Sequence, residues 1–83
     1  MTVQFERAAR RDLSRLSRED AATVVDALVA FAQSGVGDVR KLQARNPPEW
    51  RLRVGRYRVL FRRESNAISV FAVRDRKDVY RRP

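Results

Sequence analysis

The segment from Trp50 to Phe61 constrains the fold more than any other part of the chain. It reads Trp-Arg-Leu-Arg-Val-Gly-Arg-Tyr-Arg-Val-Leu-Phe, two runs of largely alternating polarity joined by Gly55-Arg56. A period of two is typical of strands that bury one face, and a two-residue loop with Gly first is typical of a type II′ hairpin turn. The sequence therefore predicts a β-hairpin with Val54 opposite Tyr57, and hence with Arg53 opposite Arg58.

This register sorts the hairpin side chains onto two faces. The apolar face is predicted to comprise Trp50, Leu52, Val54, Tyr57, Val59 and Phe61. The other face carries Arg51, Arg53 and Arg58, and like charges placed opposite one another on a sheet repel. The pattern therefore favours an anion-binding face, although a charged face also serves simply to prevent edge-to-edge aggregation.

Basic residues concentrate in the last third of the chain. Residues 51–83 hold eleven basic and three acidic residues, whereas residues 1–50 hold eight and seven. A localised positive field suits a polyanion, either nucleic acid or an acidic protein partner. Seventeen of the nineteen basic residues are Arg, which favours planar, bidentate contacts to phosphate.

Length and composition limit the classes of protein to consider. Eighty-three residues predict a single domain, residues 1–83, with one modest core. The absence of Cys and His excludes disulfides, zinc fingers and imidazole catalysis, and we expect no metal or other cofactor. No apolar run approaches the length of a membrane span, so a cytoplasmic protein that does not bind membranes is expected.

The first half of the chain predicts one strand and a pair of helices. Residues 2–5 alternate in polarity as in a short strand, and the apolar spacing predicts helices over about 7–16 and from Ser17 to about Ser34. Ser17 is the expected N-cap and Gly35 the expected C-cap of the second helix. Residues 35–49 are expected to be an irregular connection, with Leu42 as its anchor in the core.

The second half predicts sheet. Three antiparallel strands are predicted, over residues 50–54, 57–63 and 67–73. The last of them is apolar on both faces and is therefore expected to be central. A basic tail follows, in which Val79 is expected to pack against the fold. The expected fold class is α+β: an N-terminal strand, a two-helix hairpin, and then a three-stranded antiparallel sheet.

Three segments in this order carry a family resemblance. Lys41-Leu42, the hairpin at 50–61 and the run Val-Arg-Asp-Arg-Lys-Asp-Val-Tyr at 73–80 resemble the RelE/ParE superfamily of bacterial toxins, and its RelE branch in particular. The resemblance implies two helices packed on one face of the sheet and an open opposite face. It also implies a toxin that enters the ribosomal A site, cuts mRNA there as an endoribonuclease, and is held inactive by a RelB-like antitoxin.

The resemblance also implies the site residues. The residues that match its catalytic set are Arg51, Arg53, Arg58, Arg76 and Tyr80. Further basic residues are predicted to bind RNA: Arg56, Arg62, Arg74, Lys77 and Arg81. Many relatives have Gly-His where this chain has Arg74-Asp75, and Arg74 is an alternative to Arg76 in the active site.

The expected chemistry needs no metal, because a ribose 2′-OH can attack the adjacent phosphate and leave a 2′,3′-cyclic phosphate and a 5′-OH. Arginines would clamp the phosphate, Arg76 would stabilise the leaving oxygen, and Tyr80 would act as base or orienting group. A purely structural Tyr80 at the sheet edge is the alternative. Two other functions stay open: a ParE-like toxin that inhibits DNA gyrase, and a catalytically weakened module that binds RNA or the ribosome.

Overall fold

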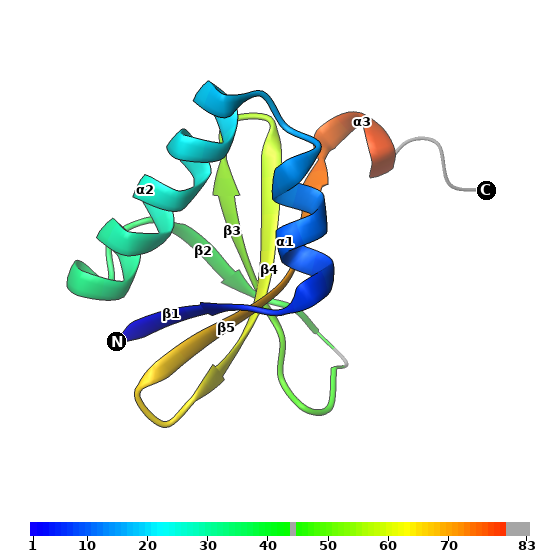
Figure 1. Ribbon diagram of the computed structural model, residues 1–83. Helices are drawn as coiled ribbons and strands as arrows, with labels where there is room; N and C mark the ends of the chain where they lie inside the picture. Colours follow the sequence, from blue (N-terminus) through cyan, green and yellow to red (C-terminus); the bar gives the residue numbers. More distant parts are fainter. Residues whose placement is uncertain (44, 80–83) are drawn as a thin grey trace.

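The computed structural model of the protein describes residues 1–43 and 45–79 (Figure 1). The elements in chain order are β1 (Thr2–Phe5), α1 (Arg7–Ser14), α2 (Arg18–Ser34), β2 (Asp38–Lys41), β3 (Trp50–Val54), β4 (Tyr57–Glu64), β5 (Ala67–Asp75) and α3 (Arg76–Val79). Helices α1 and α2 lie together on one face of a twisted sheet (Figure 1). No helix among the described residues has the length and apolarity needed to cross a membrane.

The α+β class is confirmed, but the sheet is larger than predicted. It has five strands in the order β1-β5-β4-β3-β2, and β1 runs parallel to β5 while the other neighbours are antiparallel. The expectation of a three-stranded antiparallel sheet was therefore wrong in extent. β1 joins by parallel pairing with β5, more than sixty residues away, and β2 joins by antiparallel pairing with β3. The local sequence pattern of β1 or β2 does not reveal these partners.

The predicted hairpin register is confirmed. Val54 pairs with Tyr57 and Arg53 pairs with Arg58, and Gly55 takes a φ of 57° in the two-residue turn. A positive φ at the first turn position is what a type II′ turn requires, and glycine adopts it without steric strain. The turn therefore fixes which side chains face the helices.

The helix boundaries follow their caps. Ser17 Oγ accepts the Asp20 backbone N–H at 3.0 Å, and Gly35 ends α2 in the left-handed conformation with a φ of 75°, both as predicted. Helix α1 ends at Ser14, two residues before the predicted Leu16. The N–H groups of Arg15 and Leu16 bond carbonyls three residues back, and this tighter turn closes the helix early.

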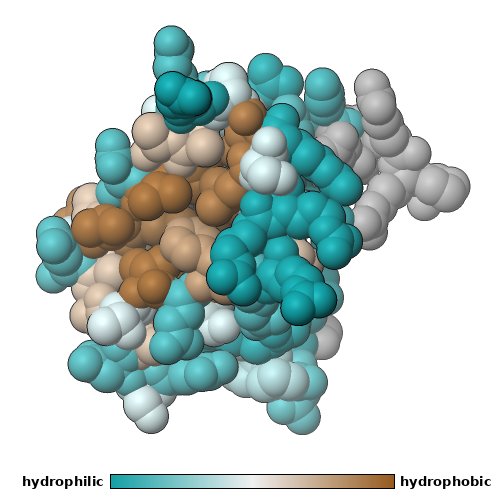
Figure 2. Space-filling view, in the orientation of Figure 1, coloured by the Kyte–Doolittle hydropathy of each residue, from teal (hydrophilic) through white to brown (hydrophobic). Residues whose placement is uncertain are grey.

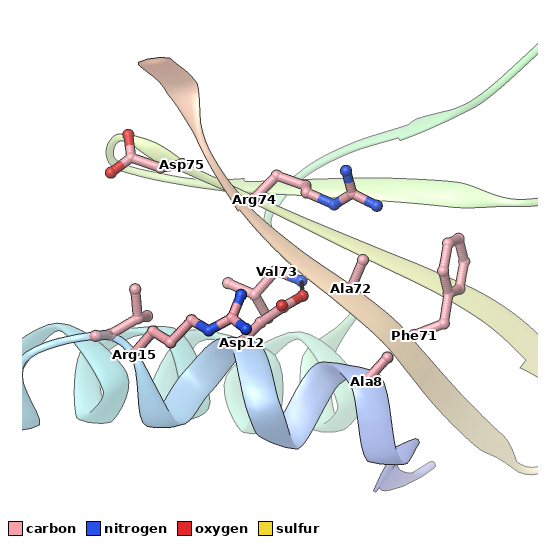
Figure 3. A pocket seen from close by; sticks show the side chains of 9 residues that line it. Ala8, Asp12, Arg15, Phe71, Ala72, Val73, Arg74 and Asp75 are labelled. Atoms are coloured by element: carbon pink, nitrogen blue, oxygen red, sulfur yellow. Dashed lines mark hydrogen bonds between the residues drawn. The ribbon is translucent and has the colours of Figure 1, made fainter. Parts of the chain in front are cut away.

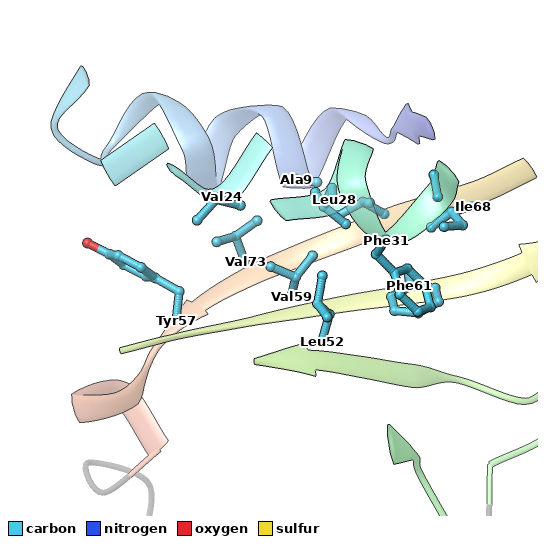
Figure 4. Close-up of a cluster of buried hydrophobic side chains, with 12 residues drawn as sticks. Ala9, Val24, Leu28, Phe31, Leu52, Tyr57, Val59, Phe61, Ile68 and Val73 are labelled. Atoms are coloured by element: carbon cyan, nitrogen blue, oxygen red, sulfur yellow. The ribbon is translucent and has the colours of Figure 1, made fainter. Parts of the chain in front are cut away.

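The core lies between the two helices and strands β3 to β5. Val24, Leu28 and Phe31 of α2 point toward the sheet, where Val59 and Phe61 are fully buried (Figure 4). The Phe31 and Phe61 rings lie 5.7 Å apart at 55°, a tilted arrangement that aromatic pairs favour. Trp50 is half-buried against the same cluster, so its predicted packing role is confirmed.

The connection between α2 and β3 is more ordered than predicted. Its residues 38–41 form β2, the edge strand beside β3, and Val39 lies opposite Leu52 on the core face. Val39 and the predicted anchor, Leu42, are both half-buried, but Val39 is the one that packs against the core cluster. The Leu42 N–H donates to the Glu49 carbonyl at 2.9 Å. The position that faces the core is therefore set by pairing with β3.

A side-chain hydrogen bond ties the hairpin to the start of α2. The Tyr57 hydroxyl donates to a carboxylate oxygen of Asp20 at 2.6 Å, and Tyr57 is buried apart from 8% of its surface. This hydrogen bond, with a smaller contribution from burial, raises the pKa of Tyr57. Asp20 thus holds β4 against α2.

We expect Tyr57→Phe to lower the free energy of unfolding by about 1–2 kcal/mol, because it removes a hydrogen bond to a charged acceptor while keeping the ring. Urea unfolding of the variant and parent measures the difference. Thr23→Val, which removes an exposed hydroxyl bonded only to the Glu19 carbonyl, is the control and should change stability much less. Equal stability of Tyr57→Phe and the parent would contradict the role of this contact.

Candidate nucleic-acid interface

A row of arginines crosses the sheet face that α1 and α2 leave open. Arg53 of β3 pairs with Arg58 of β4, and Arg58 pairs in turn with Arg74 of β5. Asp38 of β2 lies beyond Arg53 in the same row. Three adjacent guanidinium groups on neighbouring strands repel one another unless an anion lies between them. The predicted Arg53–Arg58 pair is therefore part of a row of three arginines, with Arg74 as the third.

A small cavity opens at the turn end of this row. Its volume is about 180 Å³, and it is lined by Arg53, Gly55, Arg56, Tyr57, Arg58 and Arg76. We call it the arginine pocket. Among the side chains that the structure describes, no acidic one lines it, and its size suits a group such as a phosphate. Three of the five predicted catalytic residues, Arg53, Arg58 and Arg76, therefore meet in one place.

The position of α3 brings Arg76 into the pocket. The Arg76 backbone N–H donates to the Arg56 carbonyl at 2.7 Å, which fastens the end of β5 to the hairpin turn. Arg74, the alternative to Arg76, lines a different cavity, between β5 and α1. The structure therefore brings Arg76, and not Arg74, to the pocket.

Arg56 is held at the rim by a carboxylate. Its guanidinium donates to both Asp75 oxygens, at 2.7 and 3.3 Å, and the Lys77 backbone N–H also donates to Asp75. The hydrogen bonds from Arg56 lower the pKa of Asp75, and the same contact raises the pKa of Arg56. Because Asp75 balances the charge of Arg56, the excess positive charge of the pocket comes from Arg53, Arg58 and Arg76.

The Arg56–Asp75 ion pair should make the stability of the fold depend on pH. The lowered pKa of Asp75 means that the pair stabilises the fold above about pH 4, and that this contribution disappears as the pH falls further. We expect Asp75→Asn to have a lower melting temperature than the parent at neutral pH, and the gap to narrow below about pH 4. Thermal unfolding across this range measures it. Asp26→Asn, at an exposed position of α2, is the control; a gap for Asp75→Asn that is independent of pH would contradict the contact.

Arg51 lies on the same face but does not line the arginine pocket. Its guanidinium is 3.4 Å from the Asp38 carboxylate, and only 12% of its side chain is exposed. Burial lowers the pKa of Arg51, while Asp38 opposes this shift, and Nε is buried without a partner among the described residues. The structure therefore places Arg51 as a neighbour of Arg53 whose charge is partly balanced.

Arg62 lies at the far end of the open face, in a cluster with two carboxylates. Its guanidinium is 3.0 Å from Glu49 and 3.4 Å from Glu6, and it stacks over the Phe71 ring at 4.2 Å. Glu6 also accepts the Ser69 hydroxyl at 3.1 Å. RNA binding by Arg62, as predicted, would require one of these ion pairs to open.

A groove of about 390 Å³ runs between α1 and the second half of β5 (Figure 3). Arg15 and Arg74 line it, together with Phe71 and Asp12. β1 pairs with β5 only as far as Val70, and beyond this point the Asp12 carboxylate accepts the Val73 N–H at 2.9 Å. Asp12 therefore provides an acceptor for a backbone N–H at a strand edge that β1 does not reach. The sequence around Asp12 does not predict this role.

The remaining predicted residues divide into two groups. Lys77 is exposed on α3 beside Arg56 and Arg76, so it can extend the basic rim. Tyr80 and Arg81 lie outside the described residues, as does the predicted packing of the Val79 side chain. The described part of the chain contains no group of three acidic side chains arranged to hold a metal ion.

Comparison with known proteins identifies the family of the chain. Residues 3–80 match the family described as the ParE toxin of type II toxin-antitoxin system, parDE. No curated protein sequence matches the chain significantly.

Among solved structures, the chain is similar to the toxin-antitoxin complex RelBE2 from Mycobacterium tuberculosis, with 29% identity, a TM-score of 0.76, and coverage of 90% of this chain and 96% of that chain. The RelB-RelE antitoxin-toxin complex from Methanococcus jannaschii has 20% identity, a TM-score of 0.75 and coverage of 93% and 94%. The isolated E. coli RelE toxin has 18% identity, a TM-score of 0.60 and coverage of 95% and 89%. Because the family match spans nearly the whole sequence and the fold is that of RelE, the chain belongs to the RelE/ParE superfamily of toxins of type II toxin–antitoxin systems.

Proposed function

We propose that this toxin is a ribosome-dependent endoribonuclease that cuts mRNA in the A site and so inhibits translation. The observation that carries the proposal is the arginine pocket, in which Arg53, Arg58 and Arg76 converge and no acidic residue with a described side chain takes part in the lining. A cavity of this size and charge supports binding of a single phosphate group. The likeness of the fold to RelE toxins supports the choice of mRNA as the source of that phosphate.

The pocket can stabilise the charge that develops during cleavage. In-line attack by the ribose 2′-OH places additional negative charge on the phosphoryl oxygens, and guanidinium groups held in place before the reaction stabilise this charge. Arg53 and Arg58 extend from adjacent strands, so the sheet fixes their separation. In this mechanism Arg76 lies beside the leaving 5′ oxygen and Arg51 adds positive potential from β3.

Proton transfer is assigned to Tyr80. The chain has no His and only two Tyr, and Tyr57 is unsuitable as a base because its hydroxyl donates to Asp20 and its pKa is raised. Asp75 is a weak base because Arg56 lowers its pKa. We propose that Tyr80 orients the 2′-OH or, as its phenolate, accepts the 2′-OH proton, and that the leaving 5′ oxygen takes a proton from water. The ribosome aligns the mRNA for in-line attack.

A RelB-like antitoxin is the proposed regulator. The relatives with solved structures include complexes of RelE with RelB, and the open face of this chain offers a positive surface for an acidic segment. Such a segment would cover the arginine pocket and exclude mRNA. Mutual inhibition of antitoxin and mRNA binding would support this arrangement.

Three assays with the purified protein separate the proposed function from the alternatives. Cleavage of mRNA on translating ribosomes, without cleavage of free mRNA, supports the proposal. Inhibition of DNA supercoiling by gyrase without mRNA cleavage would instead support ParE-like activity, which the name of the matched family motivates. Tight ribosome binding with neither activity would identify a binding module and contradict the enzyme assignment.

A further inference from the structure

The structure carries a second basic surface, separate from the arginine pocket. It consists of five exposed arginines on α1, the turn that follows it and the first residue of α2: Arg7, Arg10, Arg11, Arg15 and Arg18. We call it the α1 stripe. Hydrophilic side chains cover this part of the molecule, whereas hydrophobic ones gather over α2 (Figure 2). We propose that the α1 stripe binds the phosphate backbone of double-stranded RNA.

The spacing of the stripe places the arginines on one side of the helix. Arg7, Arg11 and Arg15 recur every four residues and so lie about 6 Å apart along the axis. The opposite side of α1 carries Ala9, which is fully buried, and Leu13, which packs against the core. The stripe therefore faces solvent along its whole length, as a surface for an extended polyanion must.

The stripe has no internal charge balance. Asp12 is the sole acidic residue of α1, and its carboxylate accepts the Val73 N–H instead of pairing with an arginine. Among the described residues, no ion pair involves any of the five stripe arginines. Like charges four residues apart destabilise a helix by about 0.2–0.5 kcal/mol each, and Arg7 also faces the positive end of the helix dipole. An anionic ligand would relieve both effects.

The chemistry of the stripe favours the phosphate backbone of a duplex over an anionic membrane. Guanidinium groups contact phosphate in a bidentate manner, and an A-form duplex presents continuous rows of phosphates. An anionic membrane is less suitable, because the apolar side of α1 is buried against the sheet and cannot insert. At the end of the stripe, Arg15 shares the β5 groove with Arg74, so the stripe continues toward the arginine row of the open face.

The test measures binding of a fluorescent RNA duplex of about 16 base pairs as a function of salt. The variant Arg7→Gln/Arg11→Gln/Arg15→Gln preserves helix propensity, and circular dichroism checks its fold. We expect its affinity to fall by about tenfold or more and the salt slope to decrease by about 2–3, close to 0.9 for each lost phosphate contact. The control Arg40→Gln/Lys41→Gln/Arg45→Gln removes the same charge from exposed positions around β2 and should weaken binding much less.

Several outcomes would overturn the proposal: an unchanged salt slope in the α1 variant, an equal loss in the control, displacement of the duplex by polyglutamate at equal charge, or binding to anionic vesicles without binding to RNA. The proposal does not depend on cleavage. Arg58→Ala should retain most of the duplex affinity while losing mRNA cleavage. Failure of the cleavage proposal and failure of the stripe are therefore distinguishable in the same set of proteins.

Discussion

Replacing Arg58 with alanine is expected to slow mRNA cleavage on ribosomes by about 10²–10³-fold, the usual effect of removing one preorganised donor from a transition-state site. Arg58 occupies the middle of the arginine row, between Arg53 and Arg74, and it also lines the arginine pocket. Its loss removes the central positive charge of the row. Single-turnover cleavage on programmed ribosomes measures the rate directly.

The fold should survive this substitution. Arg58 lies on the open face and contributes no core contact, and its removal relieves repulsion with Arg53 and Arg74. Arg40→Ala, on the same face but outside the pocket, is the matched control and should cut at nearly the parental rate. Arg58→Lys should recover part of the activity, because the charge remains while bidentate contact is lost. Cleavage by Arg58→Ala at the parental rate would remove Arg58 from the site.

The second large effect concerns the core. Phe61→Ala is expected to lower the free energy of unfolding by about 3–5 kcal/mol, because it deletes a fully buried ring and leaves a cavity beside Phe31. The total stability of a domain is only about 5–15 kcal/mol, so this variant should be close to unfolding at physiological temperature. Urea unfolding measures the change.

Phe71 provides the control for this prediction. It is the same residue type, but it is half-buried on β5 and stacks with Arg62. Phe71→Ala should therefore destabilise the protein clearly less than Phe61→Ala. The reverse order would show that the principal core does not lie between α2 and the sheet.

The elements that were predictable from the sequence are those specified by local chemistry. The Gly55-Arg56 turn determined the pairing of Arg53 with Arg58, and Ser17 and Gly35 determined the limits of α2. Strand β2 was missed because Asp-Val-Arg-Lys carries a single apolar residue and becomes a strand only by pairing with β3. The parallel pairing of β1 with β5 joins segments more than sixty residues apart, and no local pattern encodes it.

In the candidate site, too, the sequence predicted some features and not others. The alternation of side chains predicted the open arginine face, whereas the contacts that partly balance it, Arg51 with Asp38 and Arg56 with Asp75, join different elements and become visible only in three dimensions. The α1 stripe has a four-residue spacing that is present in the sequence. The net charge of residues 1–50 does not reveal it, because most of the acidic residues that offset these arginines lie outside α1.

We propose that the arginine pocket cuts mRNA in the ribosomal A site by 2′-OH attack. The most direct test maps both new ends of an mRNA incubated with the protein on ribosomes stalled at a known codon. The predicted result is a cut within the A-site codon, with a 2′,3′-cyclic phosphate on one product and a 5′-OH on the other, which Arg58→Ala does not produce. An intact mRNA, cuts outside the A site, or a 3′-OH end would contradict it.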